Sequence, residues 1–146
     1  MKSFTRLRDF LEDGPEDVPI TFEYSASFRI AGLDLPFDEI ERVLQLSASH
    51  THRKGEHRGK TTFKEDMWRL ESPLVETRPL SEHLDWLWTQ LAPHKAYLLT
   101  LKKRYHIDVF AGYRSSCDMA GLDIPIASMQ IYFDLGIPFG LSIVVA

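Results

Sequence analysis

The sequence predicts an α+β fold, a ferredoxin-like sandwich in which helices cover one face of an antiparallel or mixed sheet, with an extra C-terminal helix-strand unit. Three observations support this. Residues 20–30 alternate apolar and polar side chains with period two, as in a strand with one buried face. Apolar residues recur at helical spacing between positions 80 and 101. The expected order is strand, helix, weak hairpin, strand, two helices, strand, short helix and strand.

The composition is that of one folded domain. The chain has 146 residues, of which 44% are apolar and 26% charged, and this balance excludes wholesale disorder. No run of about 18 apolar residues is present, so a membrane-spanning helix is not expected. Arg6 and Arg8 lie where a signal peptide would be apolar, and Cys117 has no second cysteine to pair with. We therefore expect a cytoplasmic protein without membrane contact.

The predicted organisation has two segments. Residues 1–19 form an N-terminal helical extension, and residues 20–146 form a single α+β domain. Within the extension, residues 4–12 predict a short amphipathic helix, which is marginal alone and needs a surface to pack on. Its apolar side consists of Phe4, Leu7 and Leu11, with Phe10 near them.

Periodicity and turn residues define the other elements. In the strand over 20–30, the even-numbered side chains are expected to face the helices. Gly32 ends this strand, and Pro36 opens a helix whose apolar stripe reaches Leu44. The polar segment 50–63 predicts a long turn or an edge hairpin in water. The later elements are a strand at 67–71, a helix over 80–91 with Ser81 as its N-cap, a second helix after Pro93, a strand at 107–113, a short helix within 126–135 and a final strand at 139–145.

Charge is unevenly distributed along the chain. The formal net charge is −4, yet residues 50–64 contain five of the 17 Lys and Arg residues and a single acid, Glu56. Gly55 and Gly59 would let the backbone approach a ligand, so this segment could hold a phosphate or carboxylate group. Nucleic acid is not expected, because no aromatic residues are interleaved with the charges. The candidate anion-binding residues are Arg53, Lys54, Arg58 and Lys60.

Three histidines of the same segment suggest a metal site. His50 and His52 would point to the same side of a strand, and His57 could approach them from a returning strand. Neutral imidazoles are good ligands for zinc, copper or nickel. The flanking cations oppose metal binding, and a solvated basic loop is the alternative interpretation. No cofactor motif is present, so we predict no cofactor.

Two further side chains are candidates for a functional role. Cys117 follows a strand that carries His106, but the two are eleven residues apart and Asp118 would raise the thiol pKa, so a nucleophilic enzyme is not expected. Trp86 lies about 200° around its helix from the apolar stripe of Leu84 and Leu91. It marks either a partner surface or a site buried under the N-terminal helix.

Short motifs in order along residues 20–145 resemble a bacterial domain-of-unknown-function family, family 4279. The residue before Pro36 is Leu35, where that family often has Asp, and His50-Thr51-His52 replaces its usual proline and aromatic residue. The resemblance implies a compact bacterial intracellular domain and supplies no reaction, cofactor or catalytic residue. The motifs are Gly32 with Leu35 to Ile40 and Leu44-Gln45-Leu46, Arg53 to Glu56, Met67 to Ser72, Leu80 to Leu84, Leu91-Ala92-Pro93, and Leu135-Gly136-Ile137.

These observations favour a non-enzymatic binding module that docks on another protein, for example an immunity or regulatory protein. Two alternatives remain open. One is a domain that binds a small anionic ligand or metabolite through the basic segment 50–64. The other is a metal-dependent enzyme built around His50, His52 and His57.

Overall fold

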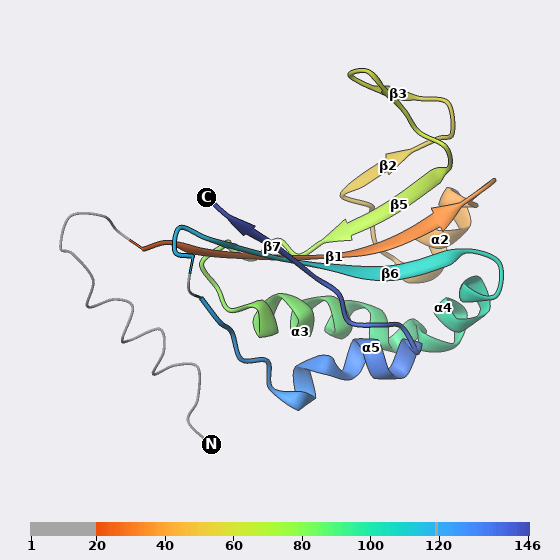
Figure 1. Cartoon of the computed structure of the whole chain (residues 1–146). Helices are drawn as coiled ribbons and strands as arrows, with labels where there is room; N and C mark the ends of the chain where they lie inside the picture. Colours follow the sequence, from red (N-terminus) through yellow and green to blue (C-terminus); the bar gives the residue numbers. More distant parts are fainter. Residues whose placement is uncertain (1–19, 119) are drawn as a thin grey trace.

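The computed structural model of the protein describes residues 20–118 and 120–146 (Figure 1). The predicted N-terminal extension, residues 1–19, lies outside the described residues. The buried apolar side chains of the described part form one core between the sheet and the helices. No helix of this part is both long enough and apolar enough to cross a membrane.

A five-stranded sheet organises the fold. Its strands lie in the order β2-β5-β1-β6-β7, with antiparallel neighbours except for the parallel pair β6 and β7. Up to β6, the strands of this sheet and the helical segments between them follow the β-α-β-β-α-β order of a ferredoxin-like fold. A further helix and β7 come after β6, as predicted. The strands are β1 (Phe22–Gly32), β2 (His50–His52), β5 (Asp66–Glu71), β6 (His106–Ser115) and β7 (Leu141–Val145).

The central strand β1 is amphipathic as its sequence predicts. The even-numbered side chains from Phe22 to Ile30 are all buried, and Phe28 and Ile30 are fully inaccessible to solvent. The odd-numbered side chains lie on the opposite face of the sheet, because successive side chains of a strand alternate. Ser27 is also buried on that second face, since its neighbours in register are Phe110 and Glu71.

Helices cover one face of the sheet, with α3, α4 and α5 lying together below it in Figure 1. Leu84, Leu87 and Leu91 of α3 are fully buried. Ser81 is not the N-cap, so that prediction was wrong: α3 begins at Leu80 because Pro79, with φ −53° and ψ 146°, occupies the capping position. The helices are α2 (Phe37–Leu44), α3 (Leu80–Leu91), α4 (Lys95–Lys102) and α5 (Gln130–Leu135), with 3-10 turns at Ala92–His94 and Ile126–Met129.

Of the two forms predicted for residues 50–63, a long turn or an edge hairpin, the structure shows a hairpin. After β2, the chain projects from the body as an arm made of β3 (His57–Arg58) and β4 (Thr61–Thr62), which pair with each other (Figure 1). Residues 53–62 of this arm are exposed. The sequence predicted that this loop would lie wholly in water, and for His52, at the root of the arm, that prediction was wrong. His52 is buried because its ring stacks on Phe63 at a centroid distance of 3.6 Å.

Candidate functional site

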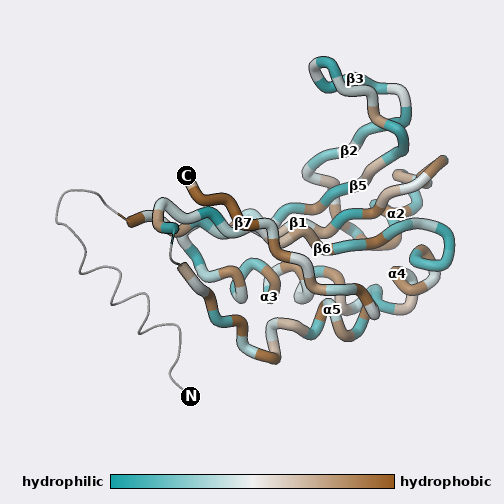
Figure 2. Tube along the Cα trace, in the orientation of Figure 1, coloured by the Kyte–Doolittle hydropathy of each residue, from teal (hydrophilic) through white to brown (hydrophobic). Residues whose placement is uncertain are grey.

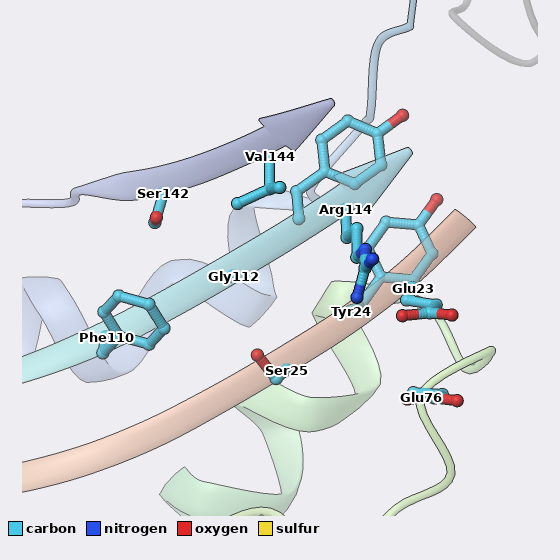
Figure 3. A pocket seen from close by; sticks show the side chains of 10 residues that line it. Glu23, Tyr24, Ser25, Glu76, Phe110, Gly112, Arg114, Ser142 and Val144 are labelled. Carbon is cyan, nitrogen blue, oxygen red and sulfur yellow. The ribbon is translucent and has the colours of Figure 1, made fainter. Parts of the chain in front are cut away.

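The sheet face opposite α3 carries a shallow hollow at β1, β6 and β7 (Figure 3). Ser25 pairs with Gly112, and Gly112 pairs in turn with Ser142. Three small residues therefore lie side by side across three strands and make a low floor. A Cβ atom at Gly112 would lie 2.5 Å from Ser25 Oγ and 3.4 Å from Phe110 Cε1, so glycine at position 112 keeps the floor low without displacing the Ser25 side chain.

The two ends of the hollow differ in chemistry. Figure 3 shows the Phe110 ring at one end and the side chains of Arg114, Glu23 and Glu76 at the other. Phe110, Gly112 and Arg114 are alternate residues of β6 and so share one face of the sheet. The hollow has a volume of about 240 Å³, and Phe110 is 37% exposed.

Glu76 reaches the hollow because the chain after β5 continues along β1. Ser72 N donates to Ala26 O at 3.0 Å, and Tyr24 N donates to Glu76 O at 2.7 Å. These two backbone hydrogen bonds hold the segment after β5 beside the N-terminal half of β1. They place the Glu76 side chain next to the residues that β1 contributes to the hollow.

The charged side chains in the hollow differ from those beside it in their hydrogen bonding. Next to the hollow, Arg29 forms a two-point ion pair with Asp108, Nε to Oδ1 at 2.7 Å and Nη2 to Oδ2 at 2.6 Å. This hydrogen bonding raises the pKa of Arg29. By contrast, no hydrogen bond or ion pair within the described residues involves the side chains of Glu23, Glu76 or Arg114. Glu23 and Arg114 are neighbours in register on β1 and β6, so charges of both signs lie beside each other at this end of the hollow.

The predicted anion-binding segment has a different organisation. Arg53 Nη1 donates to Asp66 Oδ2 at 2.7 Å and to Leu35 O at 2.8 Å, and its guanidinium lies 3.8 Å from the centroid of the Phe37 ring. Arg53 and Lys54 line one hollow together with two acids, Asp34 and Asp66. The other two candidates, Arg58 and Lys60, are exposed residues of the arm and do not line that hollow.

Asp66 is the centre of this arrangement. Its carboxylate is almost fully buried and accepts hydrogen bonds from Lys54 N at 2.8 Å and Leu35 N at 3.0 Å, in addition to Arg53. Burial alone would raise the Asp66 pKa, but the donors from Lys54, Arg53 and Leu35 outweigh it, and the pKa lies below its ordinary value. The root of the arm is thus a structural clasp. For brevity we call these four residues, Leu35, Arg53, Lys54 and Asp66, the Asp66 clasp.

The three candidate metal ligands lie in two places. His50 Nε2 is 3.1 Å from His52 Nδ1, whereas His57 is on the arm and is hydrogen-bonded to Thr62 Oγ1 at 3.0 Å. Burial, and then the neighbouring His50, lower the pKa of His52. Within residues 20–118 and 120–146, no group of three His, Cys, Asp or Glu side chains is placed to hold a metal ion.

Trp86 and Cys117 are neither fully buried nor fully exposed. Trp86 is partly buried and packs against the core. Cys117 is also partly buried, and its backbone N–H donates to Ser115 Oγ at 3.0 Å. His106 is near the opposite end of β6, where its Nε2 lies 3.6 Å from Asp108 Oδ2.

Sequence reasoning missed the hollow around Gly112. The alternation of β1 places Glu23 and Ser25 on the polar face, and that signal was present. Nothing in the sequence, however, showed that residue 25 pairs with residue 112, which is what brings Phe110 and Arg114 to the same place.

A comparison with family models identifies the family of this chain. The model described as "Domain of unknown function (DUF4279)" matches residues 22–146. The chain belongs to the DUF4279 family. The match includes every strand and helix of the described DUF4279 domain, from the start of β1 to the end of β7. No curated protein and no solved structure matched the chain.

Proposed function

We propose that this DUF4279 domain is a non-enzymatic binding module and that its partner protein docks on the open sheet face over the hollow around Gly112. An immunity or regulatory protein acts in this way, by holding a partner without converting it. The observation that supports the proposal most is the combination of an exposed Phe110 with the charges of Glu23, Glu76 and Arg114, for which the described residues supply no ion pair, on a face that α3 does not cover.

The dimensions of the hollow favour a protein over a small molecule. At about 240 Å³ it is smaller than the range of roughly 300–1,000 Å³ that is usual for small-molecule pockets. Protein interfaces, in contrast, are enriched in exposed aromatic residues and arginine, and a few such residues carry most of the binding energy. Phe110 and Arg114 are four residues apart on the same face of β6 and fit this description.

The lining supports a partner of mixed apolar and charged chemistry. An apolar side chain of the partner would rest on Gly112 between Phe110 and Val144, which is half exposed. An acidic group would pair with Arg114, and a basic group would pair with Glu23 and Glu76. The expected partner therefore presents an apolar side chain flanked by charges of both signs.

Variants of the face, compared with a variant of the arm, test the proposal. The wild-type domain, Phe110→Ala, Arg114→Glu and Lys60→Glu are used as baits in native extract, with quantitative mass spectrometry. Lys60→Glu is the matched control, because it introduces the same charge change on the exposed arm. We expect one protein to be retained by the wild type and by Lys60→Glu, and to lose about tenfold or more of its affinity for Phe110→Ala and Arg114→Glu, equivalent to about 1.4 kcal/mol.

Two results would contradict the proposal. One is a set of captured proteins that does not distinguish the four baits. The other is a partner lost by Lys60→Glu and kept by Arg114→Glu, which would transfer the binding role to the basic arm. Thermal unfolding of each bait shows that a loss of binding is not a loss of folding.

A further inference from the structure

A second hollow lies on the other side of the sheet, under β7. It has a volume of about 480 Å³, and its lining is almost entirely apolar. Leu122, Ile124 and Met129 form one wall, and Phe139, Leu141 and Ile143 form the other. Figure 2 shows hydrophobic colour both on β7 and on the segment between β6 and α5.

This apolar hollow is open to solvent in the described part of the chain. Ile143 is 60% exposed and Phe139 40% exposed, and Ile126 beside the same segment is 91% exposed. Apolar side chains gathered in one exposed place mark a surface that receives another apolar group. The hollow is therefore a candidate surface for another apolar group.

We propose that the occupant is the N-terminal segment of the same chain, whose side chains Phe4, Leu7 and Leu11 fill the hollow under β7. The sequence of this segment predicts an apolar side, and a helix this short persists only when it packs on something. The hollow supplies a surface of matching chemistry. The inference is independent of the proposed function, because the hollow faces away from the one around Gly112.

The chain enters the fold at the edge of this hollow. Thr21 N donates to Ser116 Oγ at 2.8 Å, and Ser116 N donates to Thr21 O at 3.1 Å. The next residue, Phe22, stacks with Tyr113 at a centroid distance of 6.2 Å. Tyr113 lines the hollow, and its hydroxyl donates to Gly121 O at 3.3 Å. The start of β1 is therefore connected to the wall of the hollow through the stacked rings of Phe22 and Tyr113.

The length of the connecting chain limits how far Leu11 can lie from Ile20. Residues 12–19 join Leu11 to Ile20, and an extended chain spans roughly 3.3 Å per residue, or about 25 Å over this stretch.

Paramagnetic relaxation in the full chain tests the inference. In a Cys117→Ser background, a nitroxide is attached at Ser3→Cys, and the methyl signals of Ile124, Met129 and Ile143 are recorded. We expect these signals to broaden strongly. The same label at Lys60→Cys on the arm should leave them sharp. Leu7→Asp should abolish the broadening, whereas the matched variant Thr5→Asp, away from the apolar side, should retain it.

Three outcomes would overturn the inference. The first is sharp methyl signals with the label at Ser3→Cys. The second is broadening that persists in Leu7→Asp, which would deny a role to the apolar side chains. The third is broadening in a mixture where label and isotope are on different chains, which would assign the hollow to a second copy.

Discussion

Asp66 joins three parts of the chain at the root of the arm. One carboxylate receives the backbone N–H groups of Leu35, which follows β1, and Lys54, which follows β2, as well as the Arg53 guanidinium. Because Arg53 is half in water, the ion pair itself contributes little. The stabilisation comes chiefly from hydrogen bonds to a buried, charged acceptor.

Replacing Asp66 by Asn tests the clasp. The amide keeps one acceptor oxygen and turns a donor toward groups that are themselves donors, so we expect Asp66→Asn to reduce the free energy of unfolding by about 2 kcal/mol. Urea denaturation at pH 7 measures it. Asp34→Asn is the matched control: Asp34 is exposed, and asparagine tolerates its left-handed backbone, φ 57°. Equal stability of the two variants would refute the role of the clasp.

The same carboxylate predicts a pH dependence. Its pKa in the folded protein lies below the ordinary value of 3.8, so its stabilisation is complete above that pH and is lost as the pH falls through the lower, folded-state pKa. Protonated Asp66 then resembles asparagine. Urea midpoints of wild type and Asp66→Asn should therefore differ most near neutral pH and converge in acid. A difference that stays constant through this range would contradict the prediction.

At the scale of the elements, α3 contributes the largest part of the helical layer against β1. Leu84 is fully buried, and its neighbour Asp85 is exposed. We expect Leu84→Ala to lower the free energy of unfolding by about 2–5 kcal/mol, the range for deletion of buried leucine side chains. Asp85→Ala should change it by less than about 0.5 kcal/mol. Denaturant titrations compare the two, and a similar effect of both would contradict this packing.

The sequence was most informative for elements with strong periodicity. The alternation of β1 correctly predicted which side chains enter the core, because a one-residue shift would have exposed Phe28 and Ile30. The burial of His52 could not be predicted from periodicity. It depends on Phe63 returning from β4 to stack on the imidazole, a contact across the arm that neither residue signals alone.

At the scale of the whole molecule, the missing information was strand pairing. Ser25 and Gly112 are far apart in the sequence but adjacent in the sheet, and the hollow exists only through that pairing. The basic segment looked like a functional centre because its charges are consecutive. Folding instead engages Arg53 in the clasp and leaves Arg58 and Lys60 on the arm.

The central claim is that the sheet face around Gly112 binds the partner, and cross-saturation tests it most directly. The captured partner is left protonated and irradiated, while the deuterated domain reports the loss of amide signal. The account predicts the greatest loss at Phe110, Gly112 and Ser142. Greatest loss at Lys54 and Lys60 of the arm, or at Trp86 on the helical side, would contradict it.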